Sequence, residues 1–105
     1  MTLFTAPDHA PSALHLLVSG HVQGVGFRYF VRQATEALGV AGWVRNLRDG
    51  RVEAVLLGKA HAVQHVLDQI GRGPRGARVD EVVTRLALPE ECQAARSPCE
   101  LRTTI

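Results

Sequence analysis

The chain has 105 residues, which is the size of one domain with a single hydrophobic core. Apolar residues make up 46% of the sequence, a content that excludes a disordered chain, and no apolar run approaches the roughly 20 residues of a membrane-spanning helix. Twelve basic and ten acidic side chains give a net charge of +2, too small a surplus to indicate a protein that coats nucleic acid.

Residues 1–12 contain two prolines and have neither a basic start nor a long apolar run. We interpret this segment as a flexible tail rather than a secretion signal, and we assign residues 13–105 to the domain. Cys92 and Cys99 are too few, and spaced too far apart, to indicate a disulfide framework. We therefore expect a cytoplasmic protein with reduced thiols.

The first predicted element is a strand over Leu14–Ser19, an apolar run with the length of a buried strand. Three glycines then interrupt the pattern over Gly20–Gly26. A helix is predicted from Phe27 to Gly39, because apolar residues recur every three or four positions and polar residues lie opposite them. The apolar stripe consists of Phe27, Phe30, Val31, Ala34 and Leu38.

Two further strands are predicted over Val40–Asn46 and Arg51–Leu57. The connection Leu47–Gly50 ends in Asp-Gly, a pair that favours a β-hairpin. A second helix follows Gly58, with Val63, Val66, Leu67 and Ile70 on its apolar face and Gly71 as its expected end.

The last third of the chain begins with a glycine-rich loop over residues 71–76 and a fourth strand over Arg78–Leu86. Apolar and polar residues alternate from Cys99 to Ile105, which indicates a short edge strand. The order βαββαβ predicts an α+β fold of the ferredoxin-like, split-βαβ type. This fold is an antiparallel sheet with two helices on one face.

In such a sheet the first two strands run parallel, with the third strand between them. Their C-terminal ends therefore share one edge, roughly 10 Å apart at two strand spacings. We expect side chains from Gly20–Arg28 and from Asn46 to meet at this edge.

The loop Gly20–Arg28 lies between a strand end and a helix start. Glycines allow successive N–H groups to turn toward one point, and a helix N-terminus adds partial positive charge. Arg28 supplies a planar fork of donors that suits phosphate oxygens. These features favour a site for a phosphate-like anion, although the same glycines are also compatible with a tight turn that binds nothing.

Other glycine-loop functions do not fit this sequence. A Walker A loop ends in Gly-Lys-Ser/Thr, and no lysine is present in this loop. The dinucleotide fingerprint needs a third glycine where Tyr29 stands, and a cysteine-based phosphatase needs a thiol in the loop. The string around Phe27–Val31 faintly matches an RNA-recognition signature, but that signature belongs on a strand and this segment has helical periodicity.

Two strings in the chain resemble the two signatures of the acylphosphatase family. Val18–Arg28 reads VSGHVQGVGFR and resembles the first, while Gly42–Val52 reads GWVRNLRDGRV and, continuing to Gly58, resembles the second. No position inside either string departs from the family pattern, and the likeness extends from about Leu14 to Val83. The resemblance implies a small ferredoxin-like hydrolase that cleaves carboxyl-phosphate bonds without a metal or cofactor.

The resemblance also implies roles for individual residues. Arg28 corresponds to the catalytic arginine that binds phosphate, and Asn46 corresponds to the asparagine that positions the attacking water. The implied partner is a small-molecule acyl phosphate, with no nucleic acid and no membrane, and we expect a monomer. The implied phosphate loop comprises Gln23, Gly24, Val25, Gly26, Phe27 and Arg28.

A non-catalytic module that binds an acyl phosphate within a larger assembly is the alternative, and the presence of both Arg28 and Asn46 favours turnover. His61 and His65 have the i, i+4 spacing of zinc ligands, but no third ligand is near in sequence, so we expect a solvated helix face. Trp43 is expected in the core, with a part in shaping the acyl side of the site as the alternative.

Overall fold

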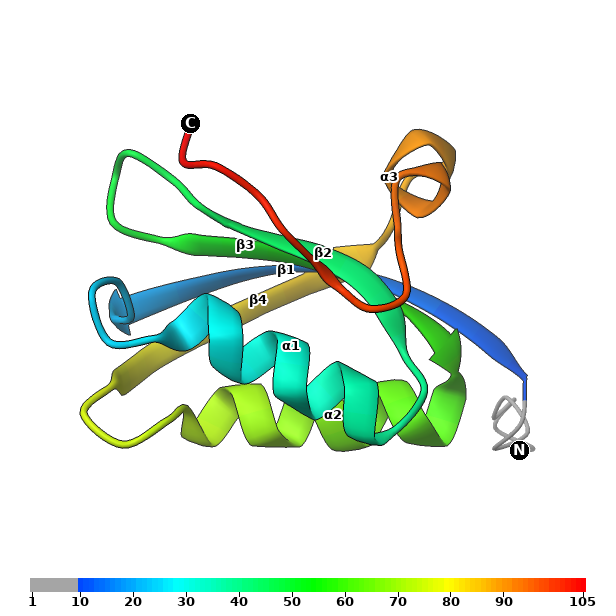
Figure 1. Cartoon of the computed structure of the whole chain (residues 1–105), viewed down its shortest axis with the longest axis horizontal. Helices are drawn as coiled ribbons and strands as arrows, with labels where there is room; N and C mark the ends of the chain where they lie inside the picture. The colour runs from blue at the N-terminus through cyan, green and yellow to red at the C-terminus, as the bar shows by residue number, and fades with distance from the viewer. Residues whose placement is uncertain (1–9) are drawn as a thin grey trace, which may run out of the picture.

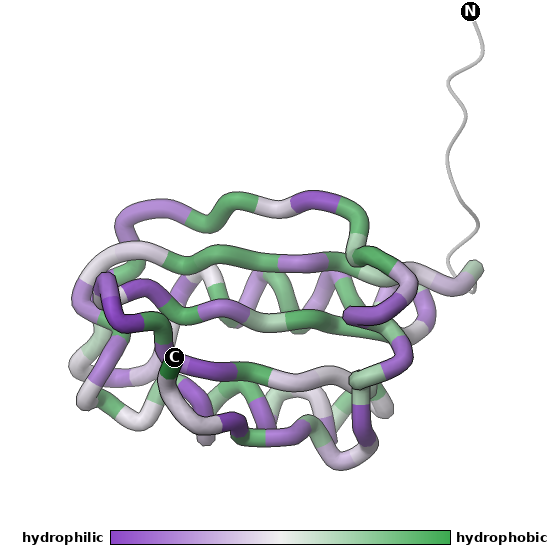
Figure 2. The backbone as a smooth tube through the Cα atoms, turned by 90° about the horizontal axis from the view of Figure 1, so that it is seen from above, coloured by the Kyte–Doolittle hydropathy of each residue, from purple (hydrophilic) through white to green (hydrophobic). Residues whose placement is uncertain are grey.

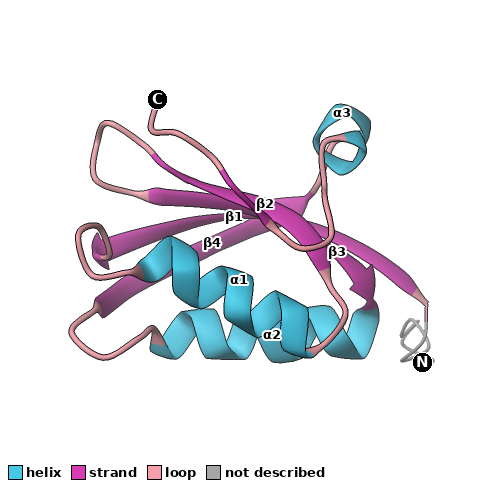
Figure 3. Cartoon of the chain, viewed as in Figure 1, coloured by secondary structure: helices cyan, strands magenta, loops and turns pink. Residues whose placement is uncertain are grey.

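Five strands form one sheet in residues 10–105, the part of the chain that the structure, a computed structural model, describes (Figure 1). Helices α1 and α2 lie side by side on one face of this sheet, and the short α3 lies on the other face (Figure 3). The elements are β1 (Pro11–His21), α1 (Phe27–Ala37), β2 (Ala41–Asn46), β3 (Val52–Lys59), α2 (Ala60–Arg72), β4 (Arg78–Leu86), α3 (Pro89–Gln93) and β5 (Glu100–Leu101).

The strand order is β4-β1-β3-β2-β5. β3 runs antiparallel to both β1 and β2, so β1 and β2 are parallel and their C-terminal ends share one edge, as the sequence predicts. β5 pairs in parallel with β2, so the sheet is mixed and the expected antiparallel arrangement holds for four strands. The parallel pairing follows from the path of the chain. β4 runs opposite to β1 and β2, and the chain reverses direction once between β4 and β5, so β5 runs in the same direction as β2.

The hydrophobic core fills the space between the sheet and the two helices. In β1 and β3 the core positions Leu16 and Val18, and Val52, Ala54 and Leu56, recur at every second residue, so these side chains share the face that the helices cover. Figure 2 shows apolar residues, in green, running through the strands of the sheet. The fully buried side chains of this core include Leu16, Leu56, Ile70, Val18, Val31, Val44, Val63 and Val66.

The element boundaries differ from the sequence predictions mainly at the two ends of the chain. β1 begins at Pro11, inside the segment expected to be a tail, and the rest of that tail, residues 1–9, lies outside the described residues. α2 continues one residue past Gly71, and α3 is an element that the sequence analysis does not predict. No helix in residues 10–105 is long and apolar enough to cross a membrane.

Candidate active site

The loop between β1 and α1 has the backbone of an anion site. Gly24 and Gly26 adopt φ angles of 74° and 75°, a left-handed conformation that glycine takes without strain. Gly26 is the N-cap of α1 and provides no side-chain cap, so the first N–H groups of the helix have no intrahelical acceptor. These N–H groups and the helix dipole favour a negatively charged ligand.

A cavity of about 290 Å³ lies beside this loop, at the small end of the range for ligand sites. Arg28 is the one charged residue that lines it within the described chain. The positive end of α1 and this arginine therefore set the electrostatic character of the cavity. Its lining consists of Val22, Gly24, Gly26, Phe27, Arg28, Tyr29, Asn46 and Leu101.

Asn46 reaches the cavity from the last position of β2. It is two residues beyond Val44, which is fully buried in the core, so the two side chains point to the same face of the sheet as α1. The C-terminal segment, residues 101–105, forms hydrogen bonds on both sides of this position. The N–H of Ile105 donates to the Asn46 carbonyl (3.2 Å), and the N–H of Arg48 donates to the Ile105 carbonyl (2.7 Å). Figure 1 shows the chain end beside the turn between β2 and β3.

The same C-terminal segment orients Arg28. The Arg28 Nη1 atom donates to the Arg102 carbonyl over 2.8 Å. Arg102 is itself fixed, because its N–H donates to the Val44 carbonyl (2.8 Å) and its guanidinium lies 4.4 Å from the centre of the Trp43 ring. The arginine in the cavity is therefore held by backbone that lies 74 residues further along the chain.

Gln23 makes a contact that the sequence analysis misses. Its side-chain Nε2 donates to the carbonyl oxygens of Leu47 (2.7 Å) and Arg51 (2.9 Å), the residues at either end of the β2–β3 turn. Gln23 does not line the cavity, and neither does Val25, which packs against the core. The other four residues of the predicted phosphate loop line the cavity together with Asn46.

Leu101 and Tyr29 are cavity residues that the sequence analysis does not identify. The alternation near the C-terminus indicates a strand there, but no local signal specifies which strand it pairs with. Trp43, in contrast, is buried on the other face of the sheet, where its Nε1 donates to the Glu91 carbonyl (3.2 Å), and it does not line the cavity.

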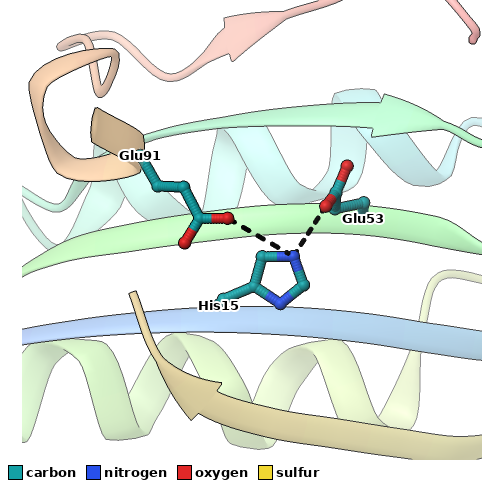
Figure 4. Close-up of side chains that lie close together, drawn as sticks. All are labelled: His15, Glu53 and Glu91. Atoms are coloured by element: carbon teal, nitrogen blue, oxygen red, sulfur yellow. Dashed lines mark hydrogen bonds and ion pairs between the residues drawn. The ribbon is translucent and has the colours of Figure 1, made fainter. Parts of the chain in front are cut away.

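A second group of ionisable side chains lies on the face of the sheet opposite α1 and α2 (Figure 4). The Nε2 atom of the buried His15 is 2.6 Å from Glu53 Oε2 and 4.0 Å from Glu91 Oε2. Arg45 Nε contacts Glu53 (2.6 Å), and Arg85 contacts both oxygens of Glu91 (2.8 Å each). Because each carboxylate already has an arginine partner, this arrangement suits the attachment of α3 better than metal binding.

The charge pairing shifts both carboxyl groups toward the ionised form. Hydrogen bonds from Arg85 lower the pKa of Glu91 from 4.5 to about 2, against the opposing effect of burial. Burial raises the pKa of Glu53, but hydrogen bonds from His15 and Arg45 outweigh it, so the net pKa is lowered.

His61 and His65 acquire no third potential metal ligand in residues 10–105.

Comparisons with known proteins give a consistent result. The acylphosphatase family model matches residues 14–93. A protein named acylphosphatase from Rhodopseudomonas palustris is 48% identical over 75 residues, which cover 71% of this chain and 76% of that protein. One from Bordetella parapertussis is 45% identical over 84 residues, which cover 80% of this chain and 89% of that protein.

Solved structures show the same similarity. An acylphosphatase from Coxiella burnetii superimposes with a TM-score of 0.78 at 35% identity, covering 88% of this chain and 93% of its own. HypF from T. kodakarensis superimposes with a TM-score of 0.69 at 28% identity, covering 88% of this chain but 12% of the HypF chain. A domain of this fold is therefore also found as a small part of a much longer protein.

Proposed function

This chain belongs to the acylphosphatase family, and we propose that its active site is the cavity between the glycine loop and the end of β2. The enzyme hydrolyses the carboxyl-phosphate bond of acyl phosphates to a carboxylate and inorganic phosphate. The observation that carries the proposal is the convergence of Arg28, Asn46 and the uncapped start of α1 on one small cavity. Among residues 10–105, Arg28 is the single charged residue in its lining.

The chemistry explains why so few groups suffice. The leaving group of an acyl phosphate is a carboxylate, whose conjugate acid has a pKa of about 4.3, as for glutamate. The departing oxygen therefore leaves as an anion at pH 7 and needs no general acid. Phosphoryl transfer depends largely on positioning and charge stabilisation, which N–H groups and an arginine provide.

Each residue then has one role in the proposed step. Arg28 and the N–H groups at the start of α1 hold the phosphoryl oxygens. The amide of Asn46 is too weak a base to deprotonate water, so it orients the water for attack on phosphorus. The bond between phosphorus and the water oxygen forms, the bond to the acyl oxygen breaks with its electron pair, and the water proton passes to a phosphoryl oxygen.

A binding module is the second candidate, because a similar domain makes up 12% of the HypF chain. Such a module would bind an acyl phosphate without turning it over. We favour the enzyme because both Arg28 and Asn46 line the cavity. We further propose that it acts as a cytoplasmic monomer without a metal or cofactor.

The test is hydrolysis of benzoyl phosphate in the presence of EDTA. We expect Arg28→Ala to lower kcat/KM by at least about 10²–10³-fold, the usual cost of a lost electrostatic donor. Asn46→Ala should lower kcat while leaving inhibition by inorganic phosphate nearly unchanged. Arg75→Ala, an exposed arginine outside the cavity, is the control.

The outcomes separate the candidates. Turnover that survives EDTA and disappears in both cavity variants supports the metal-free enzyme. Binding of the substrate without turnover by the wild type supports the module. Turnover that persists in Arg28→Ala, or that is lost in EDTA and restored by a divalent cation, contradicts the proposed site.

A further inference from the structure

We propose that Leu101 and Tyr29 form the acyl side of the cavity and make the enzyme prefer acyl phosphates with an uncharged, apolar acyl group. This inference rests on the proposed active site and adds the class of substrate that the site selects. It concerns two side chains that lie outside the phosphate loop and are brought to the cavity by the fold.

The position of Leu101 follows from strand register. Leu101 pairs in parallel with Val44, so both side chains point to the same face of the sheet. Val44 points into the core, and Asn46 lies on that face two residues further along β2. Leu101 therefore lies beside Val44, on the same face as Asn46, and both Leu101 and Asn46 line the cavity. Leu101 is 39% exposed.

Tyr29 approaches from the helix. It directly follows Arg28 in the first turn of α1, where side chains lean toward the helix N-terminus and thus toward the glycine loop. The residue lines the cavity and is 56% exposed. Within residues 10–105, Tyr29 and Leu101 are the two exposed large hydrophobic residues that also line this cavity.

The residues that line the cavity form a positively charged side and an apolar side. Arg28 and the start of α1 attract the phosphoryl group, whereas Leu101 and Tyr29 offer apolar surface that a ligand can cover. Among residues 10–105, Arg28 is the single charged residue of the lining, so a second negative charge on the acyl group finds no further cation in this part of the chain. The cavity volume of about 290 Å³, at the small end of the range for ligand sites, is suited to a small acyl phosphate such as benzoyl phosphate.

We expect the contact of the acyl group with Leu101 and Tyr29 to change the relative kcat/KM for different acyl phosphates. One methylene group in an apolar pocket changes relative kcat/KM by about 10–200-fold, and partial exposure places these residues at the low end of that range. Acetyl phosphate has a single methyl group beyond its carbonyl and gains little from the same surface. The ratio of kcat/KM for benzoyl and acetyl phosphate therefore reports on the acyl side.

The experiment measures that ratio in EDTA for the wild type and four variants. Leu101→Ala and Tyr29→Ala are each expected to lower kcat/KM for benzoyl phosphate by about 10-fold and for acetyl phosphate by less than about 2-fold. Leu101→Met and Tyr29→Phe keep apolar surface and should retain the wild-type ratio. Leu88→Ala, similarly exposed at 48% and outside the cavity, controls for general loss of stability.

Inhibition by inorganic phosphate completes the design, because it reports on the phosphate side alone. Unchanged inhibition together with a lowered ratio in both alanine variants supports the inference. Equal losses for the two substrates, or an unchanged ratio in both alanine variants, overturn it. If the wild type hydrolyses neither acyl phosphate, the proposed function itself fails, which is a different result from an unchanged ratio.

Discussion

At the scale of single residues, Gln23 connects two parts of the proposed active site, the glycine loop and the β2–β3 turn that follows Asn46. Its side chain joins the glycine loop to both ends of the β2–β3 turn through hydrogen bonds of 2.7 and 2.9 Å. Asn46 immediately precedes that turn, so Gln23 fixes the distance between the loop and the asparagine. We therefore propose that Gln23, which the family resemblance places among the phosphate ligands, acts through its side chain to position Asn46.

Replacing Gln23 by methionine tests this connection. The variant keeps the length of the side chain but loses both hydrogen bonds, while the Leu47 and Arg51 carbonyls each keep one backbone N–H donor. The net loss of two hydrogen bonds should lower the free energy of unfolding by about 1–3 kcal/mol. We also expect kcat/KM for benzoyl phosphate to fall between about 10- and 100-fold, because small displacements of catalytic groups are costly. Urea unfolding and steady-state kinetics measure the two effects.

Gln33→Met is the matched control, since Gln33 is exposed on α1. It should change neither stability nor kinetics. A Gln23→Met enzyme with normal kcat and reduced stability would show that the hydrogen bonds support the fold without positioning Asn46.

At the scale of elements, α3 illustrates how charge pairing attaches a very short helix. Five residues have little helical stability of their own, so tertiary contacts must fix the element. Glu91 supplies several of them, through Arg85, through the N–H of Leu88 at the start of the helix, and through its proximity to His15 (Figure 4). The chain beyond α3 then leads to β5 and to the backbone that holds Arg28.

The pH dependence of stability should reveal this attachment. Hydrogen bonds from Arg85 lower the pKa of Glu91 from 4.5 to about 2 in the folded protein. A lowered carboxyl pKa stabilises the fold at pH values above 4.5, and this contribution is lost as the pH falls through about 2. Glu91→Gln should therefore be less stable than the wild type at pH 7, and the difference should shrink over this acidic range.

Urea unfolding across the pH series provides the measurement, and Glu90→Gln is the control because Glu90 is an exposed neighbour in the same helix. The control should follow the wild-type curve. Equal stability of Glu91→Gln and wild type at pH 7 would show that the pairing with Arg85 contributes nothing to the attachment of α3.

The sequence predicts the long elements better than the short ones, for a physical reason. β1, β2, β3, β4, α1 and α2 each have six or more residues, enough for an apolar run or a helical period to indicate their type. α3 has five residues, too few to show a helical period, and its contacts lie far away in the chain. The alternation from Cys99 to Ile105 indicates the edge strand β5 but does not specify the strand it pairs with. The parallel pairing of β5 with β2 depends on the path of the whole chain rather than on local pattern.

At the scale of the whole molecule, the cavity assembles from three distant segments: the loop after β1, the end of β2 and the C-terminal segment. The meeting of the first two was predictable, because parallel strands with one strand between them share an edge. The third was not, since nothing near Leu101 or Arg102 in the sequence specifies a contact with Arg28. Residues 20–58 thus predict two of the three segments that line the cavity. The third, the C-terminal segment, is known only from the fold.

A site built from three segments exists only in the folded chain, so a ligand of this site should stabilise the entire domain. Inorganic phosphate at about 100 times its dissociation constant should raise the free energy of unfolding by about 2.7 kcal/mol. Phosphate also stabilises proteins weakly through exclusion from their surfaces. Arg28→Ala in the same phosphate buffer separates the two effects, because exclusion is common to both proteins and binding at the cavity is not.

We expect urea unfolding of the wild type to shift with phosphate along the curve given by its dissociation constant, while Arg28→Ala shows only the small shift from exclusion. Sodium chloride at equal ionic strength controls for screening of surface charges. Identical shifts in both proteins would mean that phosphate binds elsewhere or not at all, and would remove the coupling between this cavity and the fold. A shift confined to the wild type links the stability of the domain to occupancy of a site whose parts come from both halves of the chain.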